Sequence, residues 1–318
     1  MKAIQLSEPG GVEVLQLVDL PVPGIKADEV LVQVKALSIN HVDVKSRNGK
    51  GVFGRLKDQL PLILGWDISG IVTDVGQHVK NFKKGDAVLG MVNFPGHGKA
   101  YAEYVAVPAS QLALKPGNIS FEEAAAATLA ALTAWQALVT NAKIKKGDKV
   151  LIHAASGGVG HFAVQLAKHL SAYVVGTSSA KNKDFVLSLG ADEHIDYKNQ
   201  KFEESTSNLD FVLDAIGGEY IDRSLEVIKP GGTIISIPSG LNESVTEKAK
   251  EKGVNGYFIL VQSNGEDMKN IAQLLESGAI KANVSEIFPF EQMAKAHTSV
   301  ESGRTVGKVV VVHHSFGE

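Results

Sequence analysis

The first third of the chain consists of short runs in which apolar and polar residues alternate. Residues 29–36, Glu-Val-Leu-Val-Gln-Val-Lys-Ala, alternate as half-buried β-strands do. Further runs of this kind, with glycines between them, cover residues 68–75, 86–91 and 101–108. The pattern predicts a twisted antiparallel assembly of strands rather than a series of βαβ units.

The pattern changes near residue 120. Ser120 and Glu123 have the spacing of a helix capping box and precede an alanine-rich apolar segment, 124–139, which predicts a buried helix. Beyond it, apolar runs alternate with segments of helical periodicity. The predicted strands are 149–154, 172–177, 210–215, 233–237 and 257–261. Continuous apolar strands separated by helices predict a parallel sheet covered on both faces.

This alternation of strands and helices ends near residue 280. The remaining segments predict a strand over 284–289, a helix over 291–300 and a closing strand over 308–312. We therefore expect an α/β protein in which a doubly wound domain, residues 121–279, is inserted into a β-rich domain, residues 1–120 plus 280–318.

Composition narrows the classes of function. The chain has no cysteine, which excludes disulfides, thiolate metal sites and cysteine nucleophiles. Its net charge of −3 provides no broad positive field for nucleic acid or an anionic membrane. The apolar segment 124–139 is shorter than the roughly 20 residues that cross a bilayer. We expect a soluble, cytoplasmic protein whose partners include neither nucleic acid nor a membrane.

A glycine-rich loop follows the predicted strand 149–154 and opens a helix. Its sequence is Ala155-Ser156-Gly157-Gly158-Val159-Gly160, with alanine where the commoner dinucleotide fingerprint has its first glycine. Glycines let the backbone turn tightly and approach a pyrophosphate, which the helix N-terminus then binds. Because the loop lies between a strand and a helix, we predict that residues 156–160 bind a dinucleotide. The alternative is a glycine-rich turn without a ligand.

The end of the second predicted strand indicates which dinucleotide binds. An NAD site has an acidic residue there for the ribose 2′-hydroxyl, whereas residues 176–183 read Gly-Thr-Ser-Ser-Ala-Lys-Asn-Lys. Ser178, Ser179 and Lys183, with Lys181 nearby, are suited to a 2′-phosphate, so we predict NADPH. The alternative is that Ser179 caps the next helix and the lysines are merely solvated.

These motifs together resemble a known family. The loop 155–160, the segments 210–218, 229–232 and 307–310, and Asn-x-x-Asp at residues 40–43 with Arg47 and Gly49 resemble the medium-chain dehydrogenase/reductase superfamily. The zinc-free quinone oxidoreductase branch, which includes ζ-crystallin, is the most similar, from residue 1 to residue 312. The resemblance implies a GroES-like catalytic domain interrupted by a Rossmann domain, an active site in the cleft between them, NADPH as cofactor and a homodimer.

The resemblance also implies roles for single residues. Asn40 and Asp43 are expected near the nicotinamide, which Thr133 helps to hold. Ser179 and Tyr197 are expected at the 2′-phosphate. The remaining residues of the expected cofactor site are Ile216, Ser239, Phe258 and Lys308.

Metal ligands of the zinc-dependent relatives are replaced in this chain. It has Gly65-Trp66-Asp67 where those relatives have Gly-His-Glu, and it lacks their cysteine near Asn40. His41 with Asp67 could still form a nitrogen–oxygen site, but scattered polar pairs are more often structural. The adjacent histidines at 313 and 314 are interpreted as a solvated tail. We expect no metal.

Hydride transfer without a Lewis acid suits acceptors that delocalise charge, such as quinones and α,β-unsaturated carbonyl compounds. Asn40 and Tyr101 are the candidate donors to the developing oxyanion, although Tyr101 could be an ordinary strand residue. Asp43 and Arg47, at i,i+4 spacing, are interpreted as a structural ion pair. The expected acceptor pocket, whose members could equally be core residues, is Phe53, Trp66, Met91 and Phe94.

Two alternatives remain open at this point. The first is an enoyl-thioester reductase, which needs a basic patch for a carrier phosphate that the sequence does not show. The second is a non-catalytic NADPH-binding protein of the crystallin kind.

Overall fold

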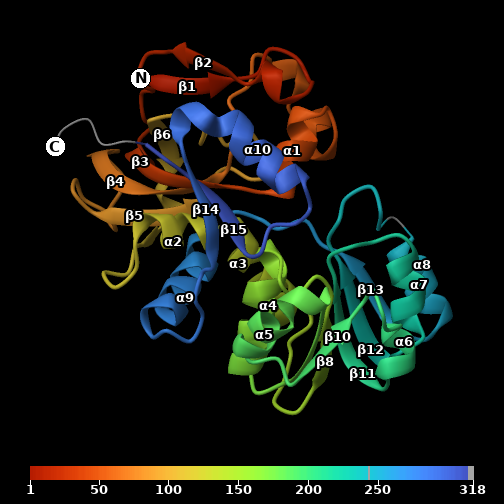
Figure 1. Cartoon of the computed structure of the whole chain (residues 1–318). Helices are drawn as coiled ribbons and strands as arrows, with labels where there is room; N and C mark the ends of the chain where they lie inside the picture. The colour runs from red at the N-terminus through yellow and green to blue at the C-terminus, as the bar shows by residue number, and fades with distance from the viewer. Residues whose placement is uncertain (243, 314–318) are drawn as a thin grey trace. The chain divides into compact units, whose positions relative to one another are not determined.

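The computed structural model describes residues 1–242 and 244–313, which fold into two compact units (Figure 1). Met1–Leu132 and Val261–Glu318 form the first, here called the β-rich unit, and Thr133–Leu260 form the second, the α/β unit. The α/β unit is thus inserted between two segments of the β-rich unit. No helix in the described part of the chain is both long enough and apolar enough to cross a membrane.

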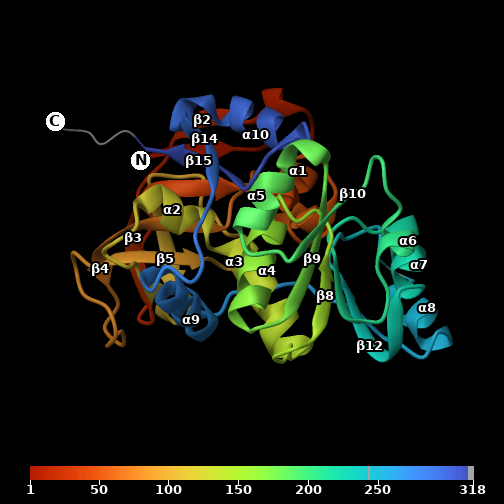
Figure 2. The ribbon, with the colours of Figure 1, turned by 60° about the horizontal axis from the view of Figure 1, so that its bottom comes forward.

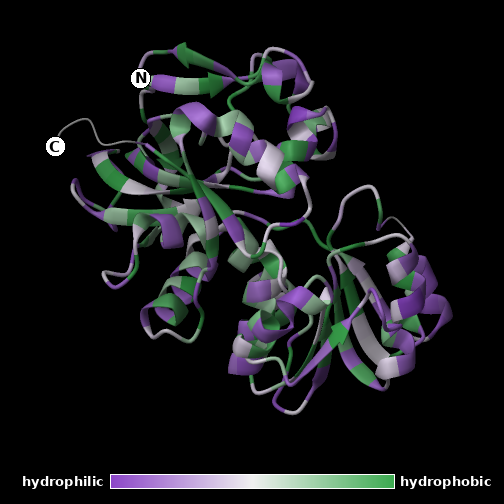
Figure 3. Ribbon diagram, viewed as in Figure 1, coloured by the Kyte–Doolittle hydropathy of each residue, from purple (hydrophilic) through white to green (hydrophobic). Residues whose placement is uncertain are grey.

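The β-rich unit is built around one largely antiparallel sheet in the order β14-β15-β3-β4-β5-β7, with β6 also paired to β3. Its strands are β3 Glu29–Ile39, β4 Asp67–Val75, β5 Ala87–Met91, β6 Tyr104–Pro108, β7 Ala113–Leu114, β14 Val284–Pro289 and β15 Lys308–Val312. A separate antiparallel pair is formed by β1 Lys2–Gln5 and β2 Gln16–Asp19. The predicted closing strand is confirmed, because β15 pairs antiparallel with β3 and returns the chain to its first domain. Its run of valines is coloured as hydrophobic in Figure 3.

Helices of the β-rich unit are α1 His41–Arg47, α2 Phe121–Ala126, α9 Gly265–Glu276 and α10 Met293–Glu301; α3 Leu129–Trp135 ends in the other unit. Short 3-10 turns occur at Val12–Val14, Gly51–Arg55, Lys57–Gln59, Ala109–Gln111 and Phe290–Gln292. The predicted capping box before α2 is confirmed, with Ser120 Oγ accepting from the N–H of Glu123 at 3.1 Å.

The segment 124–139, predicted as a buried helix, is mostly helical and buried, but it is not one continuous helix. The chain breaks between α2 and α3, where Thr128 Oγ1 donates to the carbonyl oxygen of Ala125 at 3.0 Å. The freed N–H of Leu129 donates instead to the side chain of Asp67 at 2.8 Å. After α3 the helix widens to a π-helix, Gln136–Asn141. The hydrogen bond from Leu129 to Asp67 therefore replaces the backbone hydrogen bond that Leu129 would make in a continuous helix.

The α/β unit contains a wholly parallel sheet in the order β10-β9-β8-β11-β12-β13 (Figure 2). Its strands are β8 Lys149–Ile152, β9 Tyr173–Ser178, β10 Glu193–Asp196, β11 Leu209–Asp214, β12 Ile228–Ser236 and β13 Asn255–Phe258. Its helices are α4 Gly158–His169, α5 Lys183–Ser188 after a 3-10 turn at Ala180–Asn182, α6 Phe202–Ser205, α7 Glu219–Leu225 and α8 Val245–Glu251. This is the Rossmann order, in which the connection reverses direction between β8 and β11 and ligands bind at the carboxyl ends of the strands.

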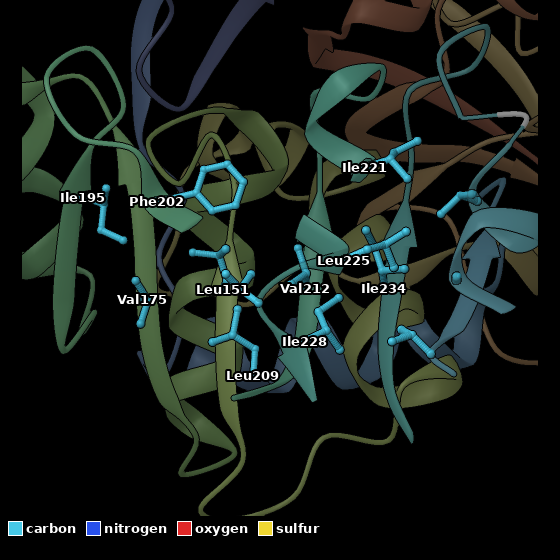
Figure 4. Packing of buried hydrophobic residues seen from close by; sticks show 14 residues of the cluster. Leu151, Val175, Ile195, Phe202, Leu209, Val212, Ile221, Leu225, Ile228 and Ile234 are labelled. Carbon is cyan, nitrogen blue, oxygen red and sulfur yellow. The ribbon is translucent and has the colours of Figure 1, made fainter. Parts of the chain in front are cut away.

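Apolar side chains from successive parallel strands form a continuous core on one face of this sheet. Leu151, Val175, Val212 and Ile234 come from four neighbouring strands and are fully buried. Phe202, from α6, packs against them, as Figure 4 shows. Burial on both faces accounts for the continuous apolar runs in the sequence.

The units divide at 132/133 and 260/261, whereas the sequence predicts boundaries at 120/121 and 279/280. The difference arises because α2 packs on β3 and β4, and α9 packs on β5 and β7, all of them strands of the β-rich unit. An amphipathic helix shows in the sequence that it has an apolar face, but not which sheet that face covers.

Candidate active site

The glycine-rich loop joins the end of β8 to α4. α4 begins at Gly158 with Gly157 as its N-cap residue, and no side chain caps that end. A side chain at Gly160 would collide with the carbonyl oxygen of Ala154, so helix and strand can pack closely here only with glycine. The N–H groups of the first turn are therefore open to an anion such as a dinucleotide pyrophosphate.

The Ser178 hydroxyl at the end of β9 is held by two neighbours. Its Oγ donates to the carbonyl oxygen of Ser179 at 3.1 Å and lies 2.8 Å from His194 Nε2, which therefore carries the proton of the second bond. Nearby, Ser156 Oγ accepts from Asn182 Nδ2 at 3.0 Å. The Ser179 side chain makes no capping hydrogen bond, so helix capping does not explain this residue.

No carboxylate belongs to the end of β9, but the neighbouring strand brings one close. Asp196 ends β10 and pairs in register with Ser178. Its buried carboxylate accepts from the N–H of Ala180 at 3.1 Å, the N–H of Lys198 at 3.2 Å and the Asn199 amide at 2.6 Å. These bonds order the loops around the carboxylate.

Asp214, at the end of β11, orders the loop that contains Ile216. Its Oδ1 accepts from the N–H groups of Ile216 and Gly217, both at 2.9 Å. Its Oδ2 accepts from Ser236 Oγ, at the end of β12, at 2.6 Å. Sequence reasoning singled out neither Asp214 nor Asp196, although a polar residue at the end of each apolar run was the available signal.

The other predicted cofactor residues of the α/β unit differ in exposure. Lys183 begins α5 and is exposed, and Tyr197, which follows β10, is 46% exposed. Phe258 ends the edge strand β13 and is 45% exposed. Thr133 is buried within α3, whereas Ser239 is partly buried after β12. Lys183 and Tyr197 thus follow two strands, β9 and β10, that are paired side by side.

In the β-rich unit, buried polar side chains meet where β3 ends and where β4 and β15 begin. Ser38 Oγ and Asn40 Nδ2 donate to Asp67 Oδ2 at 2.6 and 2.7 Å. Lys308 Nζ donates to Asn40 Oδ1 and lies 3.8 Å from Asp67 Oδ2. We call these four residues the Asn40 cluster. All four residues are buried, and Asn40, at 7%, has the largest exposed fraction against 0–3% for the others.

Asp43 lies in the first turn of α1 and is fully buried. Its Oδ2 accepts from the N–H of Asn40 at 2.7 Å, and its buried Oδ1 has no hydrogen-bond partner among the described residues. Burial, followed by the charge of Asp67, raises the pKa of Asp43 to about 7. Burial and then the charge of Asp43 raise the pKa of Tyr101 well above its ordinary value.

Tyr101 continues into a series of polar side chains that we call the Arg47 chain: Tyr101, His297, Arg47 and Glu301. Tyr101 Oη lies 2.9 Å from His297 Nε2, Arg47 Nη1 lies 3.3 Å from His297 Nδ1, and Arg47 Nη2 donates to Glu301 Oε1 at 2.6 Å. Since arginine only donates, Nδ1 accepts and Nε2 donates to the phenol oxygen, which leaves the phenol proton for neighbouring Asp43. Burial, followed by Arg47, lowers the pKa of His297 to about 3 and keeps the ring neutral.

The predicted ion pair between Asp43 and Arg47 is wrong. The Asp43 carboxylate turns back to the N–H of Asn40, whereas the guanidinium of Arg47 extends to Glu301 on α10. Tyr101, predicted as an oxyanion donor, is fully buried and lies outside the strands, because β6 begins only at Tyr104. Its ring occupies the space that a side chain at Gly65 would need, and Gly65 has a φ of +89°.

Comparison with known proteins identifies the family. Residues 26–117 match the alcohol dehydrogenase GroES-like domain, and residues 189–311 match the zinc-binding dehydrogenase domain. An NADPH-dependent alkenal/one oxidoreductase of the chloroplast from Arabidopsis thaliana is 38% identical over 98% of this chain and 79% of its own length. The chain belongs to the medium-chain dehydrogenase/reductase superfamily.

Further members of the superfamily have similar sequences and structures. A 2-methylene-furan-3-one reductase from Solanum lycopersicum is 37% identical over 98% of this chain and 79% of its own length. The quinone oxidoreductase from Coxiella burnetii has a TM-score of 0.93 and 39% identity, over 98% of this chain and 99% of that one. The Escherichia coli quinone oxidoreductase complexed with NADPH has a TM-score of 0.85 and 29% identity, over 98% of this chain and 100% of that one.

Residues expected to form the acceptor pocket are largely buried in this member of the superfamily. Trp66 and Met91 are fully buried, and Trp66 Nε1 donates to the carbonyl oxygen of Gly96 at 2.7 Å. Phe94 packs edge-on against Trp66 with ring centroids 5.3 Å apart and is 6% exposed. Phe53, in the turn Gly51–Arg55, is partly exposed.

The described residues contain no group of three or more His, Cys, Asp or Glu side chains arranged to hold a metal. Of the two C-terminal histidines, His313 is not a solvated tail residue. It packs on the Phe290 ring at a centroid distance of 4.0 Å, and burial lowers its pKa to about 4. His314 lies outside the described residues.

The buried carboxyl of Asp43 predicts a pH dependence of stability. With a pKa raised to about 7, folded Asp43 keeps a proton between pH 4 and 7 that the unfolded chain loses. The free energy of unfolding should therefore fall as pH rises through this window, by up to about 1.4 kcal/mol per pH unit. Urea denaturation of wild type and Asp43→Asn should give a flatter profile for the variant. Asp74→Asn, which removes an exposed carboxylate, is the control and should keep the wild-type slope.

Proposed function

We propose that this enzyme reduces the conjugated double bond of enones, or quinones, by hydride transfer from NADPH and without a metal ion. The observation that carries the proposal is the Asn40 amide, which is held by hydrogen bonds in a buried polar cluster. Relatives 37–38% identical over 98% of the chain are named as an alkenal/one oxidoreductase and a furanone reductase. These names support an enzyme rather than a non-catalytic NADPH-binding protein.

The α/β unit fits NADPH. The open first turn of α4 suits the pyrophosphate, and Gly160 removes the side chain that would separate helix and strand. Ser178 and Ser179, at a strand end whose nearby carboxylate is already occupied, suit the 2′-phosphate, with exposed Lys183 able to add positive charge. When bound, the cofactor supplies the hydride, and the protein supplies orientation and electrostatics.

The β-rich unit supplies the group that stabilises the reacting oxygen. As hydride adds to an enone or quinone, negative charge collects on a carbonyl oxygen, which then requires a hydrogen-bond donor. Asn40 has two N–H bonds on Nδ2, and Asp67 accepts one of them. The second N–H is the donor that we assign to the acceptor oxygen. Tyr101 suits this role less well, because its fully buried hydroxyl already contacts His297.

A second candidate function is the reduction of enoyl thioesters. The CurK enoyl reductase has a TM-score of 0.89 and 29% identity, over 98% of this chain and 99% of that chain. Hydride addition to an enoyl thioester develops charge on a carbonyl oxygen in the same way, so Asn40 would have the same role. Comparing rates on an enone and on its thioester analogue separates the two functions.

We further propose that the enzyme is a cytoplasmic homodimer. β13 lies at the edge of the parallel sheet, and its Tyr257 and Phe258 are 47% and 45% exposed. An uncovered edge strand with large apolar side chains is suited to pairing with a second copy.

The first prediction of this proposal concerns cofactor preference. Ser179→Asp should invert the preference from NADPH to NADH, because a carboxylate repels a 2′-phosphate and accepts from a 2′-hydroxyl. Fluorescence titration of both cofactors measures the change. Ser207→Asp adds the same charge at an exposed position of the same unit and should leave the preference unaltered. Equal affinity of the wild type for both cofactors would contradict the assignment of NADPH.

The second prediction concerns metals. Chelation with EDTA should leave the rate of enone reduction within about twofold of the untreated enzyme, because charge stabilisation rests on Asn40 rather than on a Lewis acid. Elemental analysis of active protein should find no stoichiometric zinc. A rate that EDTA abolishes and added zinc restores would show that the reaction needs a metal.

The third prediction concerns the oxyanion donor. Asn40→Ala should lower kcat on conjugated acceptors by about 10²–10³, the usual cost of one oxyanion donor, with a smaller change in NADPH affinity. Steady-state kinetics and cofactor titration must be performed on the same preparation. The control is Asn118→Ala, which removes an exposed amide bonded to the Glu276 carbonyl oxygen. Full kcat in Asn40→Ala would restrict Asn40 to a structural role.

A further inference from the structure

Lys308 is a buried lysine whose hydrogen bonds go mainly to a neutral side chain and the backbone. It begins β15, is 3% exposed, and donates to the carbonyl oxygen of Ile39 at 3.0 Å and to Asn40 Oδ1. Asp67 Oδ2 is farther away, at 3.8 Å. Lysines are rarely buried, because desolvating an ammonium group is costly. A lysine that closely contacts an amide and a carbonyl in this setting needs an explanation beyond ion pairing.

Stabilising Asp67 is not a sufficient explanation. The Asp67 carboxylate already accepts from Ser38 Oγ, Asn40 Nδ2 and the N–H of Leu129, at distances of 2.6 to 2.8 Å. Three donors at this range satisfy a buried carboxylate well. The short contact of Lys308 goes to Asn40 instead.

Together, Lys308 and Asp67 determine which way the Asn40 amide points. An ammonium group can only donate hydrogen bonds, and an ionised carboxylate can only accept them. The amide must therefore turn its oxygen to Lys308 and its nitrogen to Asp67, since the flipped orientation would face donor to donor and acceptor to acceptor. With one N–H on Asp67, the other N–H of Nδ2 is left in a defined direction.

We propose that Lys308 is a positioning residue for the reduction. Lys308 fixes the orientation of the Asn40 amide so that the second N–H of Asn40 donates to the acceptor oxygen, and it places a positive charge behind that amide. The inference rests on the proposed function, because it gives the amide an acceptor oxygen to serve. A fixed cation one hydrogen bond behind a donor strengthens that donor in a medium of low dielectric. The Lys308 charge thus acts on the oxyanion through Asn40.

The reduction consumes one hydride from NADPH, which becomes NADP⁺, and one proton from water, which becomes hydroxide. Hydride adds to the β carbon of the enone, and the electron pair of the C=C bond moves so that the carbonyl oxygen becomes an enolate oxygen. Asn40 and the Lys308 charge stabilise that oxygen. A proton from water then adds to the α carbon and re-forms the C=O bond, so the product is the saturated ketone.

Replacement of Lys308 by a neutral side chain of similar length tests the proposal. Lys308→Met should lower kcat on an enone by about 10²-fold, as losing an oxyanion donor does, with a smaller change in the affinity for NADPH. Lys115→Met is the matched control, because its Nζ donates to the backbone carbonyls of Pro116 and Ile119, and it should keep the wild-type kcat. An unchanged kcat in Lys308→Met would overturn the proposal.

A double variant separates positioning from general damage to the fold. If Lys308 acts through Asn40, adding Lys308→Met to Asn40→Ala should cost no further rate, because the amide that it orients is already gone. Multiplied effects of the two substitutions would show an independent role for Lys308 and would contradict the proposal. If Lys308→Met does not fold, Asp67→Asn removes the other constraint on the amide and should lower kcat similarly with NADPH affinity retained.

A readout independent of turnover keeps the inference separate from the proposed function. The side-chain amide signals of Asn40, assigned in ¹⁵N spectra by their loss in Asn40→Ala, should exchange protons slowly in wild type and faster in Lys308→Met. Equal exchange would contradict the locked amide even if the enzyme reduces enones as proposed. A locked amide in a protein that reduces no conjugated acceptor would instead refute the proposed function alone.

Discussion

Burial of the Asp67 carboxylate is the constraint on which the β-rich unit depends. A charge removed from water is tolerated only when hydrogen bonds replace its hydration, so the chain must bring donors to it from elsewhere. Ser38 and Asn40 arrive where β3 ends, Leu129 at the start of α3, and Lys308 with β15. The same requirement breaks the expected helix at Thr128 and sets the Asn40 amide in place. The hydrogen bonds that stabilise the buried Asp67 carboxylate are therefore also the ones that orient the candidate catalytic amide of Asn40.

The Arg47 chain is a second set of buried polar side chains that satisfy one another by hydrogen bonds, and it reaches the surface at Glu301. Glu301, on α10, is the partly exposed end of a series that passes through Arg47 and His297 to Tyr101. Donor and acceptor roles follow from Arg47, which can only donate, and they direct the Tyr101 proton toward Asp43. A hydrogen-bonded series in which each role is assigned can hold a helix, a loop and the first turn of α1 in one arrangement. In the α/β unit, Asp214 has a comparable role, because its carboxylate accepts hydrogen bonds from backbone N–H groups of the loop after β11.

Much of the architecture could be predicted from local patterns in the sequence. Period-two runs located β3, β4, β5 and β6 but missed β1 and β2, and continuous apolar runs located most of the parallel sheet. Burial on one face or on both leaves different patterns. β10 was missed because Glu193–Asp196 is short and begins with polar residues. The break in the helical segment 124–139 was also missed, because an apolar pattern does not reveal a hydrogen bond from Leu129 to a side chain 62 residues away.

By itself, the sequence determined the glycine-rich turn, because that turn depends on residue identity at a short spacing. The replacement of the metal ligands and the choice of Asn40 followed instead from the resemblance to a known family. Only the tertiary structure decided which charges meet. Arg47 pairs with Glu301, 254 positions away, rather than with Asp43 on its own helix, and Lys308 reaches Asn40 across 268 positions. The physical reason is that the energy of a buried polar group depends on its nearest donors and acceptors in space. Those neighbours are brought together by strand pairing such as that of β15 with β3, which local sequence patterns do not encode.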